Sequence, residues 1–262
     1  MVNVQLTDQA AIITAAASGL AAATAERLAE AGANLVLGDI NEEGVKKKAA
    51  ELAEKYDIKA FGLKCDTSDK EEFRQLFELA KKEFGKIDIV VNVAGISNHQ
   101  PLEEADEDAV RKMVEINIFG IDYAYKLAWD YMKDQGHGRV VGISSVAGRG
   151  GSTLEPHYAM TKAAVINLTQ SYAILGAKAG ITYNSICPGI IRTNIWNEWL
   201  NSHFDTPEKR DAVFQSFVDK IIPLKRAQEP IDIANAILFF VSDLSRNITG
   251  QALNVCGGMH MD

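Results

Sequence analysis

The sequence predicts an α/β fold, a doubly wound parallel sheet with helices on both faces, within a single domain that spans residues 1–262. Three observations support this fold class. Short apolar runs alternate with helical patterns along nearly the whole chain. One run, at residues 87–93, is apolar apart from two polar residues, as expected of a parallel strand buried on both faces. The chain of 262 residues is 47% hydrophobic, so it is long and apolar enough to bury a large core.

The first elements have the length of one βαβ unit. An apolar run at residues 10–14 leads through a turn of small residues into a helical pattern that ends near residue 32. A second apolar run follows at residues 35–37 and leads to Asp39. Strand, helix and strand within about thirty residues are typical of two parallel strands joined by a crossover helix.

The same alternation continues to the end of the chain. We expect further helices at residues 42–55, 69–84, 106–133, 157–178 and 230–243, and further strands at 58–64, 87–93, 139–144, 181–186 and 252–255. Between about residues 190 and 223 the pattern loosens into a region rich in aromatic residues, which we interpret as a substrate lid.

Composition and charge favour a small-molecule partner. The formal net charge of −8 argues against a nucleic-acid or anionic-membrane surface, since either needs clustered lysines and arginines. The three cysteines, Cys65, Cys187 and Cys256, lack metal-type spacing, which predicts no metal site and favours a reducing compartment. We find no signal-peptide pattern, and the alanine-rich stretch near residue 20 is too short and too charged for a membrane span. We therefore expect a cytoplasmic protein.

Tyr158 and Lys162 form the first candidate site. If this stretch is helical, the two residues stand one turn apart on the same face. A nearby ammonium favours the phenolate of a tyrosine, whose unperturbed pKa is about 10, so Tyr158 can then act as a base. Ser145, thirteen residues upstream, is placed to hold a substrate oxygen while the proton moves. An ordinary amphipathic pair on a helix is the alternative, and it is the better interpretation of the lone motif.

The turn from Thr14 to Ala21 is a weak dinucleotide signal by itself. Such a turn lets the backbone approach a pyrophosphate, but only Gly19 remains of the three glycines expected there. Asp39 strengthens the signal, because a carboxylate at the end of the second strand accepts hydrogen bonds from the adenosine ribose and repels a 2′-phosphate. No lysine or arginine lies within the turn, which favours NAD over NADP. The alternative is that Asp39 caps the helix that starts near Asn41.

In their order and spacing, these segments resemble the classical short-chain dehydrogenase/reductase family over nearly the whole chain. The resemblance rests on the turn Thr14 to Ala21, on Asp66, on the strand end Asn92-Val93-Ala94-Gly95, on Asn117 within Glu115 to Ile118, on the serine segment Ile143 to Gly148, on the Tyr158 helix, and on Pro188-Gly189 with Ile190 and Thr193. The thirteen-residue offset to Tyr158 selects Ser145 rather than Ser144 as the family's serine.

The resemblance implies a Rossmann-type fold and a role for each matching residue. Tyr158 would be the general acid/base, Lys162 its electrostatic partner and a ligand of the nicotinamide ribose, and Ser145 the group that orients the substrate oxygen. Asn117 would hold a water that links Lys162 to solvent. The implied NAD site comprises Thr14, Ser18, Gly19, Leu20, Asp39, Asp66, Thr67, Asn92, Ala94, Gly95, Tyr158, Lys162, Pro188, Gly189, Ile190 and Thr193.

Three positions depart from the family pattern. Ala15 and Ala21 replace glycines, and Val93 replaces an asparagine next to Asn92. If position 15 needs a positive φ, alanine adds strain of about 1 kcal/mol or more. If it does not, alanine is harmless or rigidifies the turn. These replacements bear on cofactor affinity, while the loss of the asparagine is tolerable because the backbone does the holding.

The resemblance implies NAD-dependent interconversion of a secondary alcohol and a ketone, and we favour a polyol, a sugar or a similar polar alcohol. Substrate selection is expected in residues 97–101, 149–157 and the region after Pro188. The polar candidates there are Asn98, His99, Arg149, Glu155, His157 and Asn194, each of which is more often a solvated loop residue. Trp196 and Trp199 either cover an apolar part of the substrate or pack the lid itself.

Two alternatives remain at this point. The first is a 3-oxoacyl or hydroxysteroid reductase or dehydrogenase of the same family, although Lys209 and Arg210 are the only adjacent basic pair near the lid that suits an acidic acyl carrier. The second is a non-catalytic protein with weakened cofactor binding, against which the catalytic set argues. The family also implies a homotetramer that packs through the helix at 106–133 and the Tyr158 helix.

Overall fold

The computed structural model describes residues 4–98, 100–192 and 194–261, with the side chains of Asn194, Ile195, Trp196 and Glu198 left aside. The helices of this described part are α1 (Gly19–Glu30), α2 (Glu42–Tyr56), α3 (Lys70–Phe84), α4 (Glu107–Val114), α5 (Gly120–Met132), α6 (Pro156–Gly176), α7 (Asn194–His203), α8 (Pro207–Ile221) and α9 (Pro230–Val241). Its strands are β1 (Ala10–Thr14), β2 (Asn34–Asp39), β3 (Ala60–Lys64), β4 (Ile89–Asn92), β5 (Gly138–Ile143), β6 (Ile181–Pro188) and β7 (Ala252–Val255). Most of the predicted elements are confirmed within a few residues at each end.

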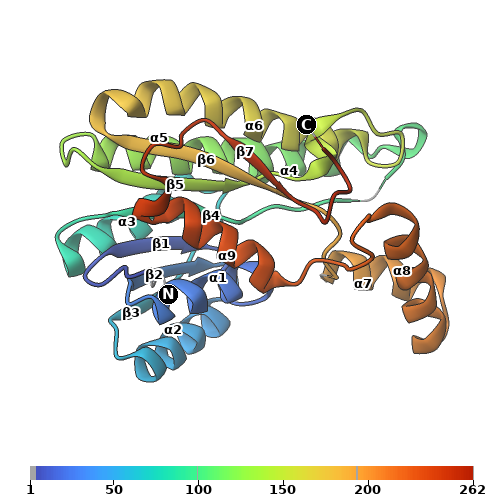
Figure 1. The fold of residues 1–262 in the computed structure, drawn as a ribbon, viewed down its shortest axis with the longest axis horizontal. Helices are drawn as coiled ribbons and strands as arrows, with labels where there is room; N and C mark the ends of the chain where they lie inside the picture. Colours follow the sequence, from blue (N-terminus) through green and yellow to red (C-terminus); the bar gives the residue numbers. More distant parts are fainter. Residues whose placement is uncertain (1–3, 99, 193, 262) are drawn as a thin grey trace.

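The strands form one parallel sheet in the order β3-β2-β1-β4-β5-β6-β7 (Figure 1). The chain begins in the middle of the sheet, winds outward to β3, and returns to place β4 beside β1. The predicted doubly wound fold is therefore confirmed. The winding direction changes between β1 and β4, and a crevice at the carboxyl ends of these strands is where ligands bind in such sheets.

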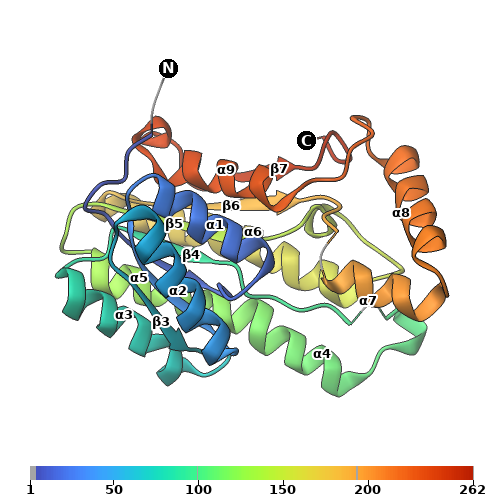
Figure 2. The same cartoon turned by 90° about the horizontal axis from the view of Figure 1, so that it is seen from below.

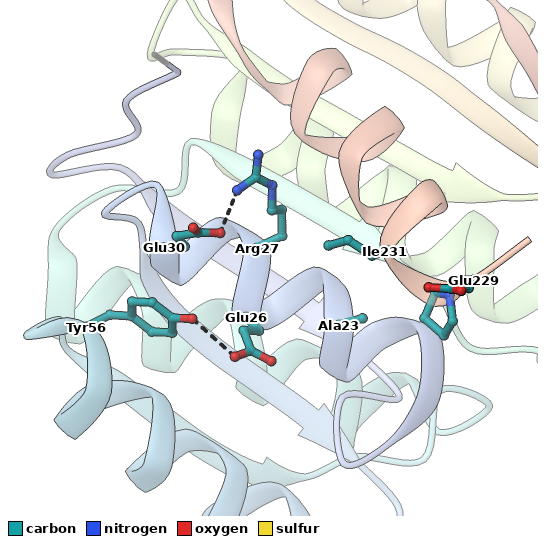
Figure 3. Close-up of a pocket in the computed structure, with 8 residues that line it drawn as sticks. Ala23, Glu26, Arg27, Glu30, Tyr56, Glu229 and Ile231 are labelled. Atoms are coloured by element: carbon teal, nitrogen blue, oxygen red, sulfur yellow. Dashed lines mark hydrogen bonds and ion pairs between the residues drawn. The ribbon is translucent and has the colours of Figure 1, made fainter.

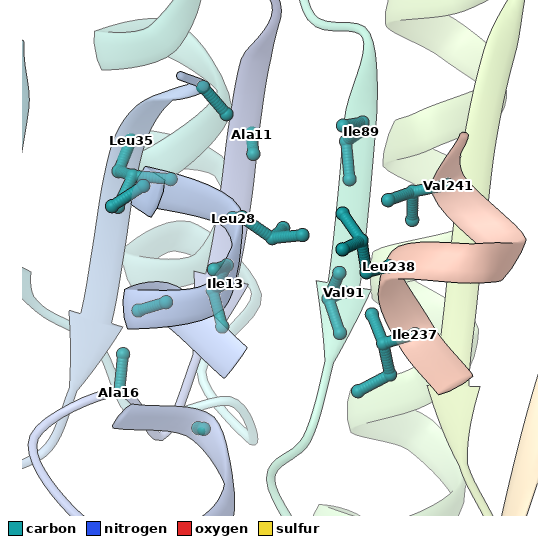
Figure 4. Close-up of a cluster of buried hydrophobic side chains, with 14 of the residues drawn as sticks. Ala11, Ile13, Ala16, Leu28, Leu35, Ile89, Val91, Ile237, Leu238 and Val241 are labelled. Atoms are coloured by element: carbon teal, nitrogen blue, oxygen red, sulfur yellow. The ribbon is translucent and has the colours of Figure 1, made fainter. Parts of the chain in front are cut away.

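Side chains alternate between two apolar layers along each central strand. Ile13 belongs to a buried cluster with Leu28 of α1 and Leu238 of α9 (Figure 4). Its neighbour Ile12 belongs to a second cluster with Phe77 of α3 and Tyr125 of α5. The first layer is covered by α1, α2 and α9, and the second by α3, α5 and α6, so the sheet is buried on both faces.

Local sequence signals explain where several helices begin and end. Asn41 caps α2 by accepting a hydrogen bond from Gly44 N (3.0 Å), and Asp69 caps α3 through Glu71 N and Glu72 N. Helix α3 ends at Gly85, whose φ of 75° suits a residue without a Cβ. The Ser18 side chain at the start of α1 makes no capping hydrogen bond, so it leaves the first amides of this helix uncapped.

The long helix predicted at residues 106–133 is confirmed as a helical run over residues 107–132, but it contains a π-helical turn. This turn, Glu115–Phe119, joins α4 to α5, with Gly120 N bonded to Glu115 O. Such a turn inserts one residue into the helical ladder and is often found at functional sites. The π-helical turn is not evident in the sequence because the apolar periodicity runs through the insertion, whereas tertiary contacts of Asn117 hold the wider turn in place.

The predicted loose region at 190–223 contains two helices, α7 and α8. They lie beyond the carboxyl ends of the strands, away from the helical layers (Figures 1 and 2). They enclose a small apolar cluster of their own, formed by Ile190, Leu200, Phe214, Val218 and Ile222. The 3.6-residue apolar period of α7 and α8 is hard to recognise in the sequence. Besides the residues of the buried cluster, further aromatic residues of this unit contact one another.

Two negative findings concern the described residues only. No helix among them has both the length and the apolarity needed to cross a bilayer. No group of three or more His, Cys, Asp or Glu side chains among them is placed to hold a metal ion.

Candidate functional site

Tyr158 and Lys162 lie in the first turns of α6 with the lysine amine beside the tyrosine ring. Lys162 Nζ lies 5.6 Å from the centre of the Tyr158 ring, and Lys162 is only 3% exposed. The amine donates a hydrogen bond to Ile143 O (2.9 Å) at the carboxyl end of β5. This contact fixes a buried cation at the edge of the sheet where ligands are expected.

The two serines that follow β5 have different partners. Ser144 Oγ donates to the Lys162 carbonyl (2.7 Å), which ties the end of β5 to the backbone of α6. Ser145 Oγ accepts from Ala147 N (3.1 Å), and the Ser145 side chain acts to lower the pKa of the nearby Tyr158 phenol. The structure therefore brings Ser145, and not Ser144, to the phenol, as the thirteen-residue offset predicts.

Asn117, in the π-helical turn, connects the loop after β4 to α6. Its Oδ1 accepts from Ile96 N (2.8 Å), and its Nδ2 donates to Ile96 O (2.8 Å) and Thr161 Oγ1 (3.0 Å). Sequence reasoning did not single out Thr161. The sequence feature that could have identified Thr161 is its position between Tyr158 and Lys162. A buried hydroxyl at this place on the helix can accept a hydrogen bond from the Asn117 amide.

Burial opposes charge on both members of the pair. It raises the pKa of Tyr158 to about 12, although the Ser145 hydrogen bond acts in the opposite direction and the Glu155 carboxylate adds to the rise. Burial also lowers the pKa of Lys162 to about 8. Burial is the largest influence on the pKa of each group, because removal from water disfavours the charged form.

The end of β1 is joined to the end of β4 by the Thr14 hydroxyl. Thr14 Oγ1 donates to Asn92 Oδ1 (2.6 Å) and accepts from Val93 N (3.0 Å) and Ala94 N (3.3 Å). These bonds hold the two walls of the crevice together. Asn92 Nδ2 is buried and has no hydrogen-bond partner among the described residues, so it is a donor that a ligand in the crevice can satisfy.

The turn after β1 adopts the conformation expected of a glycine-rich loop despite its alanines. Ala15 has a φ of 58° and Gly19 a φ of 60°. Position 15 therefore does require a left-handed backbone, and alanine there carries about 1–2 kcal/mol of strain. Ala21, in contrast, points its methyl group into the apolar core and needs no unusual backbone. A Cβ on Gly19 would meet nothing within 4 Å, so the start of α1 is open to an anion.

Asp39 at the end of β2 is held by two backbone amides. Its Oδ1 accepts from Asn41 N (2.8 Å) and its Oδ2 from Ala17 N (2.9 Å). The capping residue of α2 is Asn41 itself, so the alternative role of Asp39 as the helix cap is wrong. The carboxylate instead connects the end of β2 with the turn after β1.

The remaining predicted cofactor residues lie at two further places on the same edge. After β3, Asp66 accepts hydrogen bonds from the Ser68 amide and hydroxyl, which lower its pKa, and Thr67 next to it is buried. After β6, Gly189 N donates to Val255 O (3.1 Å). The Ile190 side chain packs into the apolar cluster of α7 and α8. Thr193 lies outside the described residues.

Some of the predicted substrate residues make structural contacts, whereas others lie near Tyr158 or outside the described residues. Arg149 donates to Asn254 Oδ1 (3.0 Å) and to Ala252 O, so it anchors the segment after β5 to β7. Trp199 stacks on His203 (ring centres 4.8 Å apart), which identifies it as packing of the lid. Ser97 Oγ donates to Glu155 Oε1 (3.3 Å) across the approach to Tyr158. His99 and the side chains of Asn194 and Trp196 lie outside the description.

These groups fit a nicotinamide dinucleotide. The open N-terminus of α1 suits a pyrophosphate, the Asp39 carboxylate suits ribose hydroxyls, and the Lys162 amine lies at the far end of the same edge. The crevice also depends on the absence of a side chain at Gly95. A Cβ there would lie 3.0 Å from Lys162 Nζ and 3.3 Å from Asn117 Oδ1.

A separate surface hollow of about 410 Å³ lies between α1, α2 and α9 (Figure 3). It contains none of the candidate residues described above. Its polar side chains already bond to one another: Tyr56 OH donates to Glu26 Oε1 (3.1 Å), and Arg27 pairs with Glu30 (2.5 Å). We therefore place the chemistry at the carboxyl edge of the sheet.

Comparisons with known proteins agree with this geometry. The family model described as Enoyl-(Acyl carrier protein) reductase matches residues 14–260. The chain is 38% identical to a diacetyl reductase, (S)-acetoin forming, of Staphylococcus epidermidis, with 95% of this chain and 97% of the relative covered. It is 33% identical to an L-rhamnose 1-dehydrogenase (NAD(P)(+)) of Azotobacter vinelandii, with 98% of each chain covered. The crystal structure of levodione reductase matches with a TM-score of 0.90 at 32% identity, over 97% of this chain and 98% of that chain.

A first prediction concerns Gly95. In Gly95→Ala, the added methyl group meets the Lys162 amine and the Asn117 amide oxygen. We expect the affinity for NADH, measured by fluorescence titration, to fall by about 5- to 150-fold, the equivalent of about 1–3 kcal/mol of overpacking. Gly150→Ala is the matched control, because a Cβ at Gly150 meets nothing within 4 Å. Equal NADH affinity in the two variants would show that the crevice does not lie beside Gly95.

Proposed function

The chain belongs to the short-chain dehydrogenase/reductase family and is an oxidoreductase of secondary alcohols and ketones; on this premise we propose that it uses NAD and that Tyr158, Ser145, Lys162 and Asn117 carry its chemistry. One observation carries the assignment. The Ser145 side chain is near enough to the Tyr158 phenol to lower its pKa, while the Lys162 amine lies 5.6 Å from the centre of the phenol ring at the same edge of the sheet. A structural pair on a helix surface would have neither the serine partner nor the buried amine.

The protein's own residues handle the proton. Tyr158 takes the hydroxyl proton of an alcohol or returns one to the oxygen of a ketone, and Ser145 orients that oxygen by a hydrogen bond. Lys162 supplies the positive charge that makes the phenolate accessible, and Ile143 O holds the amine in place. When bound, NAD supplies the acceptor for the hydride that leaves the carbinol carbon.

We assign Asn117 to the support of this site. Its amide joins the loop after β4 to Thr161, one residue before Lys162. The position of the lysine backbone therefore depends on the π-helical turn. We also propose that a water beside Asn117 links the Lys162 amine to solvent, as the family resemblance implies.

The preference for NAD rests on Asp39. Its carboxylate is fixed at the end of β2 by two backbone amides, where it can accept hydrogen bonds from ribose hydroxyls. A 2′-phosphate at this place would meet the same negative charge. The remaining implied cofactor residues, Thr14, Ser18, Gly19, Leu20, Asp66, Thr67, Asn92, Ala94, Gly95, Pro188, Gly189, Ile190 and Thr193, complete the proposed NAD site, which includes Tyr158 and Lys162.

For the substrate we propose a small polar alcohol or ketone, such as a polyol, a sugar or an acyloin. Polar side chains surround the approach to Tyr158, with Ser97 bonded to Glu155 and Asn98 bonded to Gln100 (2.8 Å). The relatives named for acetoin and L-rhamnose support a substrate of this kind. An acyl carrier protein is less suited, because Lys209 and Arg210 near the lid interact with Asp205 and Phe204 O.

We further propose how the chain is assembled and located. Residues 190–223, with α7 and α8, act as the lid of a single catalytic domain. Phe119 at the start of α5 and Met160 and Ile174 on α6 are large exposed apolar side chains, which suits a homotetramer that packs through these helices. The three cysteines are buried free thiols, which suits the cytoplasm.

The proposed cofactor and substrate class are tested with the unmodified protein. NAD reduction is measured with a panel of polyols, sugars, acetoin, hydroxy acids and hydroxysteroids. We expect turnover with polar alcohols, and kcat/KM at least about tenfold lower with NADP because the 2′-phosphate meets the Asp39 carboxylate. Comparable turnover with NADP would contradict the preference. Absence of NADH binding at millimolar concentration would favour the non-catalytic alternative.

The acid/base assignment is tested with Tyr158→Phe. Removal of the phenol oxygen removes the proton carrier, so we expect kcat to fall by about 10²- to 10⁴-fold. The dissociation constant for NADH should stay within about threefold, since the ring remains. Tyr172→Phe is the matched control on the same helix, where the hydroxyl bonds only to Asp122 in the described structure. Retained turnover in Tyr158→Phe would refute the assignment.

A pH prediction follows from the Glu155 carboxylate, which raises the pKa of Tyr158. Glu155→Gln removes a negative charge that opposes the phenolate, so the phenol pKa falls. Alcohol oxidation needs the deprotonated phenol, so its rise with pH should occur at lower pH in the variant, with Ser145, Lys162 and Cys187 unchanged around the ring. The kcat profile for oxidation measures this shift. Glu103→Gln serves as the control, and a shift to higher pH would contradict the role of the charge.

A further inference from the structure

Asp39 connects the end of β2 to the turn between β1 and α1, which we call the cofactor turn. Its Oδ2 accepts a hydrogen bond from Ala17 N (2.9 Å), twenty-two residues earlier in the chain and on the turn that leads into α1. Its Oδ1 accepts from Asn41 N (2.8 Å), which fixes the orientation of the carboxylate. A group assigned to ribose recognition is thus also a structural link between β2 and the turn.

The turn needs such a link because Ala15 is strained. Its φ of 58° is left-handed, a conformation that favours glycine. Directly after this residue, two amides bond to the end of β2: Ala16 N to Gly38 O (3.1 Å) and Ala17 N to Asp39 Oδ2. If the second bond is lost, only one hydrogen bond opposes the relaxation of Ala15 toward negative φ.

We propose that Asp39 is a positioning residue for the cofactor turn, in addition to its role at the ribose, and that this chain depends on it because alanine occupies position 15. Asp39 and Ala15 are then energetically coupled. The proposal rests on the proposed NAD site for its functional consequence, but the coupling itself is a property of the free protein.

The two roles of Asp39 are compatible in their hydrogen-bonding capacity. A carboxylate offers about four acceptor sites, two on each oxygen. One site on each oxygen is used by a backbone amide, which leaves one on each for the two ribose hydroxyls. A substitution of Asp39 that is meant to admit a 2′-phosphate would therefore also release the turn at the start of α1.

The test combines Asp39→Ala and Ala15→Gly in a double-mutant cycle. Its ligands are NADH and an NADH analogue that lacks both hydroxyls of the adenosine ribose. For this analogue, the direct contact between Asp39 and the ribose is absent. We expect Asp39→Ala to weaken analogue binding by about fivefold or more when Ala15 is present. In the Ala15→Gly background we expect a loss of less than about twofold, because glycine adopts the left-handed turn without strain. Glu43→Ala, an exposed carboxylate in the first turn of α2, is the control and should change the binding of neither ligand.

The melting temperature of the cofactor-free protein gives an independent readout. Asp39→Ala should lower Tm more when Ala15 is present than in the Ala15→Gly background. Asp39→Asn keeps one acceptor oxygen and the side-chain volume, and it replaces Asp39→Ala in the cycle if the latter does not fold.

Three results would overturn the proposal. They are unchanged analogue binding in Asp39→Ala, equal losses of analogue affinity in both backgrounds, and equal losses of Tm in both. Absence of NADH binding to the unmodified protein would instead refute the proposed NAD site, while the Tm cycle would still decide whether Asp39 and Ala15 are coupled.

Discussion

Parallel pairing of the strands is the constraint on which the arrangement of this protein depends. Because every strand runs in the same direction, the chain segments that follow β1, β2, β3, β4, β5 and β6 all emerge at one edge of the sheet. The turn with Ala15, Asp39, Asn92, Ser145 and Pro188 belong to these segments. Residues that are far apart in sequence therefore meet at the change of winding between β1 and β4, where the Thr14 hydroxyl joins the two strand ends.

Burial at this edge gives the site its electrostatic character. The half-buried Tyr158 and the buried Lys162 both lose contact with water, which favours their neutral forms, so the pKa of Tyr158 rises and that of Lys162 falls. After burial, Ser145 acts to lower the phenol pKa and Glu155 acts to raise it.

Departures from regular helix and strand geometry position residues of the site. The π-helical turn directs Asn117 toward Ile96 and Thr161 and so fixes the backbone beside Lys162. The left-handed Ala15 is retained because two hydrogen bonds from the following amides reach the end of β2. Helices α7 and α8 form a unit with its own apolar cluster, separate from the two clusters that cover the sheet.

The sequence by itself determined the fold class and the order of the strands and helices, and it predicted the central residues of the site. These follow from local patterns: apolar runs of strand length, helical periodicity between them, and the fixed offset between Ser145 and Tyr158. Only the tertiary structure decided the backbone of Ala15, the π-helical turn at Asn117, helices α7 and α8, the anchoring of Arg149 to β7 and the direction of the Tyr158 pKa. Each of these depends on burial or on hydrogen bonds between segments that are distant in the chain, such as the bond between Ala17 and Asp39. Such contacts cannot be predicted from local sequence periodicity.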